Sequence, residues 1–391
     1  MIIDCDTHFM PKDTFEYVDG PLRRLKPVLK FNGEGLLADV EFPGKPADVP
    51  GTTPLPAPGS GASLRGLCDL GVRMADYEKK LGIEQHFILP QFSGWWSYLI
   101  EPGLAIAMVH SCNTALLRIM EQYSGRIMAV ALMALQDVPG AIAKLEWAHK
   151  NGFKGAVLDK VYPVTDHPYG ESLGSRRDLW PFFQKAEELE IPLFLHNVQH
   201  GHRISNLSSF QKNGLYLFAP QEGQMSLVSL ITSGLLDDFP KLKFIFTEAG
   251  TGFIKPLIQR LDRALDGNWI DYDAAADSSG SGRKAKSVRD KLRQERALFP
   301  ANVFLEKNKK PASHYFRNNI YFTIETEEPE LAEAIEFLGP ERFLFATDYP
   351  YDDPGGRMKF QDVVLLKANP KISESDKELI RRGNAEKLFH H

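Results

Sequence analysis

Asp6 and His8 end a short apolar run, and they are the first pair of side chains in the sequence that could bind a metal ion. In an extended strand alternate side chains point to one face, so Asp4, Asp6 and His8 are expected to share a face. A carboxylate and an imidazole at this spacing can bind one metal ion, and zinc, manganese and iron all accept such donors. A surface turn at Asp6 would have the same sequence, so the assignment needs support from elsewhere.

Further ionisable side chains follow other apolar runs, each at the point where a run ends. In chain order they are Asp159, Lys160, His196, Glu248, Glu325 and Asp348. An unpaired buried charge costs several kcal/mol unless a metal or a counter-charge compensates it. Packing alone therefore does not explain so many charges at strand ends, and the pattern predicts a polar site there.

Eight short apolar runs are the expected strands that position these residues. They cover Ile2–Asp6, Gln85–Pro90, Ile127–Met133, Lys154–Asp159, Pro192–His196, Lys243–Thr247, Ile320–Glu325 and Phe343–Thr347. Helical patterns alternate with them, at Leu104–Tyr123, Val138–Asn151, Asp178–Glu190, Met225–Leu236, Phe253–Leu265, Pro329–Leu338 and Ser373–Phe389. This order predicts an α/β fold, a (β/α)8 TIM barrel with its active site at the C-terminal strand ends. A doubly wound open sheet is the alternative.

Two segments interrupt the repeat, and both are predicted to be insertions in a single domain that spans residues 1–391. Residues 22–65 are rich in Pro and Gly, and Pro27–Phe31 and Leu36–Phe42 indicate a hairpin after the first strand. Residues 267–310, between predicted strands six and seven, are expected to form a flexible loop and helix. Their mixed charges indicate a solvated surface.

Composition limits the classes of function. The chain has 391 residues, 43% of them hydrophobic, and a net charge of −5. It has no overall basic field to attract nucleic acid or a membrane, so a small-molecule partner is expected. Cys5, Cys68 and Cys112 form no CxxC pair, which favours a reduced, cytoplasmic protein. No apolar run approaches about 18 residues, which predicts no membrane span. A homodimer is compatible with the sequence.

Several segments at the predicted strand ends resemble those of a known protein family. Asp6-Thr7-His8, Leu195-His196, Phe239–Lys243 leading into Phe246–Gly250, and Phe345–Pro350 together resemble the amidohydrolase-related family. This branch of the amidohydrolase superfamily includes aminocarboxymuconate-semialdehyde decarboxylase, resorcylate decarboxylases and metal-dependent hydrolases. The resemblance covers roughly residues 1–10 and 70–390, and it implies a metal-dependent enzyme on a barrel.

The resemblance also implies roles for individual residues. Asp6 and His8 take the place of paired first-strand metal ligands, His196 matches the strand-five ligand, and Asp348 matches an aspartate that contacts the metal or its bound water. Glu248 departs from the pattern, because decarboxylase members usually have histidine there. A glutamate-bearing subset is similar to this chain, and it has a downstream segment like Lys310–Arg317.

Other candidates lie in predicted loops and could bind substrate. Charged candidates are Lys160, His202 and Arg203, and a guanidinium can hold a carboxylate through two hydrogen bonds. Aromatic candidates are Phe92, Trp95 and Trp96, which could form a flat wall against a ring or an acyl chain. Ion pairing within a loop and plain packing are the structural alternatives.

These observations predict a divalent-metal hydrolase, in which activated water attacks the carbonyl of an ester, thioester, lactone or amide and Asp348 acts as base. Zinc is the expected ion, with manganese or iron as alternatives, and Glu248 could bridge a second ion. Hydrolysis is preferred because a charge about 4 Å away is worth about 4 kcal/mol, so the Glu248 anion opposes anionic substrates. The alternatives are a decarboxylase of an aromatic or unsaturated acid and a non-catalytic barrel that binds a small acid.

Overall fold

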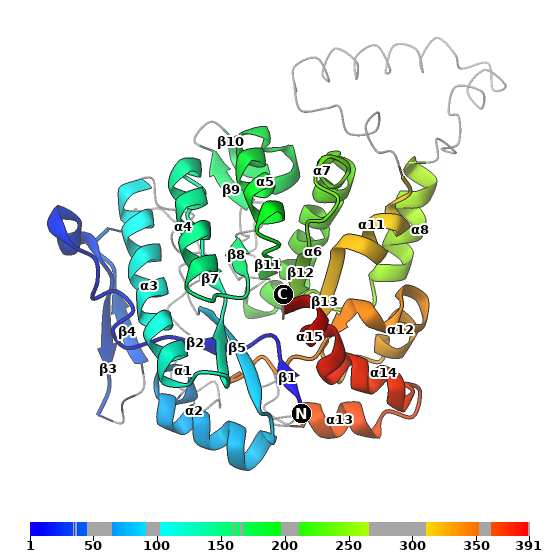
Figure 1. The fold of residues 1–391 in the computed structure, drawn as a ribbon, viewed down its shortest axis with the longest axis horizontal. Coiled ribbons are helices and arrows are strands. Elements are labelled where there is room, and N and C mark those ends of the chain that lie inside the picture. Colours follow the sequence, from blue (N-terminus) through cyan, green and yellow to red (C-terminus); the bar gives the residue numbers. More distant parts are fainter. Residues whose placement is uncertain are drawn as a thin grey trace, which may run out of the picture.

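A computed structural model describes residues 1–33, 35, 37–44, 65–90, 102–158, 161–164, 167–196, 211–265, 310–351 and 361–389. Figure 1 shows helices arranged around a central group of strands. The central strands are β1 (Ile3–Asp4), β2 (His8–Phe9), β5 (Gln85–Pro90), β6 (Ile127–Ala129), β7 (Ala131–Leu132), β8 (Ala156–Leu158), β11 (Leu193–His196), β12 (Phe244–Thr247), β13 (Ile320–Thr323) and β14 (Phe343–Leu344).

These strands form a closed parallel ring. One ladder joins β14, β13, β12, β11, β8 and β7 in that order, and a second joins β1, β2 and β6 to β5. Chain continuity through Val130 connects β6 to β7, and Val130 N donates to Ile88 O over 3.0 Å. The ring closes where Cys5 N donates to Phe345 O over 2.8 Å and Thr7 forms a parallel bridge with Tyr349. The predicted (β/α)8 barrel is confirmed, and the open sheet is excluded.

Each of the eight predicted runs contains a strand, because apolar residues on both faces suit a sheet that is buried on both sides. Two runs are divided. The first run gives β1 and β2 with Cys5–Thr7 between them, and the third gives β6 and β7. The break in the first run matters for the site, because Asp6 does not continue the alternation of a regular strand.

The main helices follow the predicted order but not every predicted boundary. They are α3 (Pro102–Gln122), α4 (Val138–Lys150), α5 (Trp180–Glu188), α6 (Gln211–Thr232), α7 (Leu235–Asp238), α8 (Ile254–Leu265), α12 (Leu331–Leu338), α13 (Asp362–Ala368), α14 (Glu374–Glu378) and α15 (Asn384–Phe389). The predicted helix over Met225–Leu236 exists but has other bounds, because α6 begins at Gln211 and ends at Thr232, and α7 starts separately at Leu235. The helices that were not predicted are α1 (Arg65–Cys68), α2 (Leu70–Asp76), α11 (Ala312–Asn319) and α13.

Two hairpins lie outside the ring of strands. The predicted one pairs β3 (Val28–Phe31) with β4 (Leu37–Glu41) in antiparallel register, and Figure 1 shows it beside α3. The second pairs β9 (Val161–Val164) with β10 (His167–Ser172) and was not predicted. Of the expected insertion at 267–310, only residue 310 belongs to the described part of the chain.

The barrel interior is filled by one apolar cluster with a residue from every strand unit. These residues are Ile3, Phe87, Val130, Val157, Phe194, Ile245, Tyr321 and Leu344. Phe389 of α15 joins this cluster, with ring centroids 4.3 Å from Phe87 and 6.1 Å from Phe194. Neighbouring strand residues belong to a second cluster shared with the helices. The barrel is therefore a packed core, and polar chemistry is confined to its ends.

Helix α3 is long and apolar enough to cross a membrane by length and composition alone. Its sequence is not an unbroken apolar run, because His110, Ser111 and Asn113 interrupt it, so the expectation of no membrane span stays a prediction. The same helix packs Leu104, Met108 and Val109 into the barrel-interior cluster and Leu116 against the second cluster. Its apolar character is explained by these contacts, as in a core helix.

Candidate metal centre

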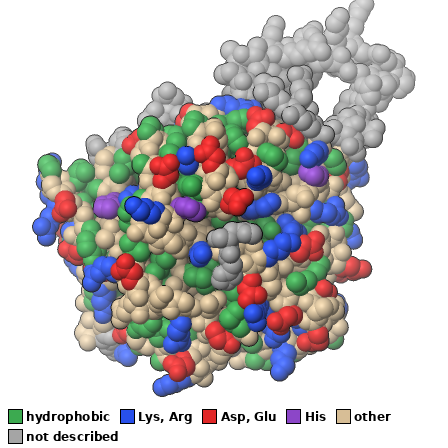
Figure 2. Space-filling view, viewed as in Figure 1, with side chains coloured by type: hydrophobic (Ala, Val, Ile, Leu, Met, Phe, Trp, Pro, Cys, Tyr) green, Lys and Arg blue, Asp and Glu red, His purple; other side chains and the backbone are tan. Residues whose placement is uncertain are grey.

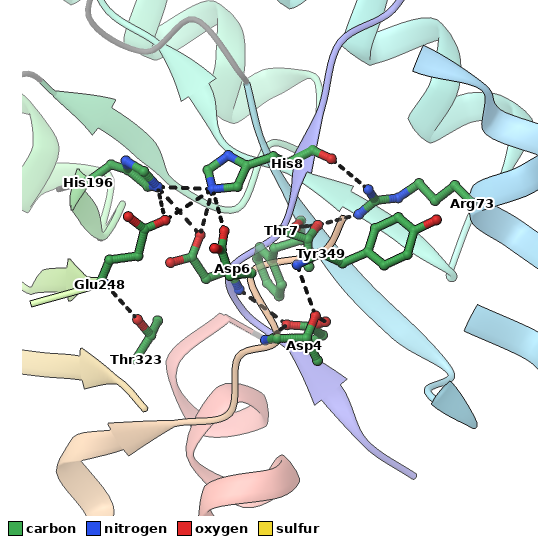
Figure 3. Close-up of polar contacts among 12 residues, drawn as sticks. Asp4, Asp6, Thr7, His8, Arg73, His196, Glu248, Thr323 and Tyr349 are labelled. Atoms are coloured by element: carbon green, nitrogen blue, oxygen red, sulfur yellow. Dashed lines mark hydrogen bonds and ion pairs between the residues drawn. The ribbon is translucent and has the colours of Figure 1, made fainter. Parts of the chain in front are cut away.

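Five predicted site residues lie at the C-terminal ends of the strands. Asp6 and His8 come from the first strand unit, His196 ends β11, Glu248 follows β12 by one residue, and Asp348 follows β14. Figure 3 shows His8, His196 and Glu248 pointing toward one another above Asp6. Asp6, His8 and His196 are buried, with 1%, 3% and 6% of their surface exposed.

The donor atoms of four of these residues meet in one small volume. One ligand atom from each of Asp6, His8, His196 and Glu248 lies within 4.8 Å of the others. The His8 and His196 Nε2 atoms are 3.1 Å apart, and Glu248 Oε1 lies 2.9 Å from His196 Nε2 and 3.3 Å from His8 Nε2. Asp6 Oδ1 is 4.0 Å from each imidazole.

These residues fit a divalent cation. Ligands about 2.1 Å from one ion lie about 3.0 Å apart when octahedral and about 3.4 Å apart when tetrahedral, as simple geometry requires. The spacings of 2.9 to 3.3 Å among His8, His196 and Glu248 match this range. Asp6 Oδ1 is buried without a hydrogen-bond partner, which would be costly unless a cation approached it. A mixed nitrogen and oxygen donor set suits manganese, iron and zinc alike.

Asp348 lies beside this cluster and is more open than its neighbours. Its Oδ1 atom is 3.1 Å from His8 Nε2, but Asp348 is not one of the four residues whose donor atoms converge. Its side chain keeps 41% of its surface exposed, compared with 1% for Asp6. The structure thus groups Glu248 with the metal-binding donors and leaves Asp348 next to them, with its Oδ1 atom buried and the rest of its side chain partly exposed.

The chain is similar in sequence to known proteins. Residues 103–390 match the family described as Amidohydrolase. The chain belongs to the amidohydrolase family. The gamma-resorcylate decarboxylase of Polaromonas sp. strain JS666 is 25% identical over 270 residues, which are 68% of this chain and 70% of that protein. The enzyme of the same name from Rhizobium sp. strain MTP-10005 is 25% identical over 293 residues, 73% and 76% of the two chains.

Solved structures support the fold of this amidohydrolase. The crystal structure of 2,6-dihydroxybenzoate decarboxylase from Rhizobium superimposes with a TM-score of 0.67 at 20% identity, over 100% of this chain and 98% of that one. An amidohydrolase from Mycobacterium avium subsp. paratuberculosis gives a TM-score of 0.69 at 22% identity, over 99% and 98%. At these identities the likeness shows the fold and no more. The predicted family is confirmed.

The charges in the amidohydrolase site strongly shift one another's pKa. Burial, opposed by His8, raises the pKa of Asp6 well above its usual value. Burial and then the charge of Glu248 raise the pKa of Asp348 to about 7. Burial also raises the pKa of Glu248, but His196 and His8 together lower it below the usual range. A bound divalent cation would favour the charged form of Asp6 and Glu248, the two carboxylates among the converging donors.

Backbone strain marks the two strand-end carboxylates of this amidohydrolase. Glu248 and Asp348 both have a φ of 51°, in the left-handed region that side chains other than glycine rarely adopt. Such a conformation costs of order 1–3 kcal/mol and persists only where surrounding contacts impose it. Asp348 N donates to Asp6 O over 3.1 Å, which ties one strained residue to a metal-binding one.

Glu248→Gln is expected to lower the affinity for a divalent ion about 10- to 100-fold while leaving the fold intact. The change keeps the shape of the side chain and removes one anion from the donor cluster. Metal titration of the metal-free protein, followed by calorimetry, measures the effect. Glu341→Gln, which makes the same change on the turn before β14, is the control, and equal metal affinity in both variants would contradict the assignment.

A buried arginine lies behind the metal-binding strand, and sequence reasoning missed it. Arg73 of α2 is fully buried. Its Nη1 donates to His8 O over 2.8 Å, its Nη2 donates to Thr7 Oγ1, and its Nε donates to His86 Nε2 over 3.1 Å. Figure 3 shows it reaching the strand from the side opposite His196. Arg73 therefore holds the backbone that carries His8.

Asp4 also holds the first strand in place through hydrogen bonds. Its carboxylate accepts hydrogen bonds from Tyr77 Oη over 2.8 Å and from Thr347 N and Oγ1 over 3.1 and 2.6 Å. The prediction that Asp4 shares a face with Asp6 and His8 was wrong, because the break between β1 and β2 ends the alternation. Asp4 instead joins the first strand to the loop that carries Asp348.

Arg73→Met is expected to lower the free energy of unfolding by about 3 kcal/mol, because it leaves His8 O and Thr7 Oγ1 without their buried donor. Urea denaturation of the metal-free protein measures the change. Arg118→Met is the control, since Arg118 is exposed and pairs with Asp13 at the surface. Equal unfolding midpoints for the two variants would show that Arg73 does not support the strand.

The remaining predicted site residues have different outcomes. Glu325 lies two residues beyond β13, where burial and then Glu328 raise its pKa to about 8. It is not among the converging donors. Outside the described residues lie Phe92, Trp95, Trp96, Asp159, Lys160, His202 and Arg203. Their assignment as substrate-binding or strand-end residues stays a prediction.

Proposed function

We propose that this amidohydrolase is a metal-dependent, non-oxidative decarboxylase of an aromatic carboxylic acid. The curated relatives are gamma-resorcylate decarboxylases. They support the carboxy-lyase alternative and do not support the hydrolysis that Glu248 favoured. Solved structures of similar fold include decarboxylases of 2,6-dihydroxybenzoate and 5-carboxyvanillate, which are aromatic acids.

The observation that carries the proposal is the position of Asp348 relative to the donor cluster. Asp348 lies 3.1 Å from His8 Nε2, yet 41% of its side chain is exposed. The cluster and Asp348 therefore lie side by side, and a ring bearing a carboxylate and a hydroxyl would bind next to both. A group that carries a proton next to a metal-binding cluster is the arrangement that decarboxylation needs.

The roles of the residues follow from this geometry. Asp6, His8, His196 and Glu248 hold a divalent ion, which when bound would orient the substrate's oxygen atoms and stabilise negative charge as carbon dioxide leaves. Asp348 transfers a proton to the ring carbon that bears the carboxylate. The bond between that carbon and the carboxylate then breaks, carbon dioxide departs, and the ring regains its aromaticity. Water returns a proton to Asp348.

The argument for hydrolysis was that the Glu248 anion would repel an acidic substrate, and the contacts of Glu248 do not favour it. Glu248 lies 2.9 Å from His196 Nε2 and 3.3 Å from His8 Nε2, inside the donor cluster. An anion that helps to hold a divalent cation has its charge compensated there. Asp6 and Glu248 together balance the charge of one such ion. Glu248 therefore does not act as a free anion against an acidic substrate.

Manganese is the ion that we propose for this site. A dihydroxybenzoic acid decarboxylase from Polaromonas sp. JS666, 20% identical to this chain, has been solved with bound manganese and an inhibitor, 2-nitroresorcinol. The mixed carboxylate and imidazole donors are compatible with it. Zinc, the ion expected from the sequence, and a second ion have no comparable support.

We also propose a single domain, a small-molecule partner, a cytoplasmic location and a homodimer.

The test is an assay of the manganese-loaded protein with 2,6-dihydroxybenzoate and its hydroxybenzoate isomers. Release of carbon dioxide, with one solvent deuterium on the product carbon in heavy water, is the expected result. Substrates with ester, lactone or amide bonds provide the comparison. Transfer of oxygen-18 from water into an acid product, without decarboxylation of any benzoate, would overturn the proposal in favour of hydrolysis.

A further inference from the structure

A pocket lies at the opposite ends of the strands from the metal centre. It has a volume of about 530 Å³. Its lining includes Ile191, Lys243 and Arg342, which lie two residues, one residue and one residue before β11, β12 and β14. Lys243 and Glu248 flank the two ends of β12, so the length of that strand separates this pocket from the donor cluster.

The lining of this pocket is strongly cationic, although the chain has a net charge of −5. Its basic residues are Lys241, Lys243, Lys310, Arg317, Arg342 and Lys387, and Glu190 is its acidic residue. None of the six cations forms an ion pair with a residue in the described part of the chain. Figure 2 shows Lys and Arg side chains gathered near the centre and right of the face it displays.

Arg342 is the most informative of these side chains. Only 8% of its surface is exposed, and its guanidinium lies over the Tyr321 ring, 4.4 Å from the centroid. Its Nε atom is buried without a hydrogen-bond partner in the described structure. A buried cation without a carboxylate partner is costly, and the planar fork of arginine matches phosphate and carboxylate oxygens. The pocket thus presents a charge that an anionic ligand would satisfy.

Lys243 is held toward the same space. Its Nζ donates to Asn318 O over 2.6 Å, which fixes the ammonium at the pocket wall. Burial and then the charges of Arg342 and Lys387 lower its pKa. Like charges pressed together in this way are relieved when an anion binds between them. Two features therefore converge on one pocket: the buried Arg342 Nε, which has no hydrogen-bond partner among the described residues, and the positioned Lys243 ammonium.

We propose that this pocket binds a small anion carrying two or more negative charges, of the phosphate or polyphosphate type. Several cations around one volume favour multivalent over monovalent anions, because each adds an attractive interaction. The guanidinium of Arg342 supplies paired donors for two oxygens. Binding there would stabilise the folded chain without contact with the metal centre.

The test uses the full-length protein and inorganic pyrophosphate, titrated by calorimetry at low ionic strength. Lys241→Gln/Lys387→Gln is the main variant, since both lysines are exposed and their replacement leaves the core untouched. Arg342→Gln is the second variant. Lys150→Gln/Lys371→Gln makes the same change of charge on other exposed surfaces and is the control. His196→Ala reports on any pyrophosphate that binds at the metal centre instead.

Pyrophosphate should bind the wild-type protein, and the Lys241/Lys387 variant should weaken this binding at least about 10-fold. The control variant and His196→Ala should bind as the wild type does. Absence of binding to the wild type, or equal affinity in the Lys241/Lys387 variant and its control, would overturn the proposal. Loss of binding in His196→Ala alone would also overturn it, because the anion would then be a ligand of the metal centre. None of these outcomes depends on the reaction that the enzyme catalyses.

Discussion

His196→Ala is expected to lose the bound divalent ion and at least about 1,000-fold of catalytic activity while keeping the barrel fold. Removing one of four converging donors takes away a strong ligand, and losing about 4 kcal/mol of transition-state stabilisation corresponds to about 1,000-fold in rate. The fold should survive because His196 is the last residue of β11, beyond the apolar part that packs in the core.

Metal analysis of the purified protein, prepared without a histidine tag, measures the loss of the ion together with the assay. His149→Ala is the matched control, because His149 lies exposed in the last turn of α4. Circular dichroism checks that both variants fold. Full metal occupancy in His196→Ala would show that the cluster is not the metal centre, whatever happens to the activity.

Asp348→Asn is expected to lower the rate about 100- to 10,000-fold, the usual contribution of a positioned proton donor, while the metal content stays near that of the wild type. An amide has the shape of the carboxyl group but cannot transfer its proton. Metal retention is expected because Asp348 lies beside the four converging donors and is not among them.

Rate measurements and metal analysis on the same preparation separate the two roles of Asp348. Asp19→Asn, at an exposed position before the first helical turn, is the control. Loss of the ion from Asp348→Asn would return Asp348 to the ligand set that the sequence predicted. An unchanged rate would leave the proposed proton transfer without a donor.

The sequence alone determined the order of the strands and the residues at their ends. Strands buried on both faces are almost wholly apolar, so a charged side chain at the end of such a run stands out without an alignment. Asp6, His8, His196, Glu248 and Asp348 were all found in this way. Topology then brings them to one end of the barrel, because the C-terminal ends of parallel strands share an edge.

The spacing of apolar residues was less informative where it was compatible with more than one kind of secondary structure. The pattern could not place the start of α6 at Gln211 or reveal the β9–β10 hairpin. These segments have weak alternation, so their neighbours in space determine their structure. The prediction of hydrolysis was limited for a similar reason. It treated the charge of Glu248 as uncompensated, because the sequence does not show that His196 and His8 lie beside it.

Only the tertiary structure decided which charges meet. Asp4 and Asp6 are two residues apart, yet the break between β1 and β2 sends Asp4 to Tyr77 and Asp6 to the donor cluster. Arg73 belongs to α2, a helix that was not predicted, and its role depends on the strand to which it donates hydrogen bonds. Residue type and strand order can be read directly from the sequence. The compensation of a buried charge depends on residues up to hundreds of positions away, and only the folded chain brings these together.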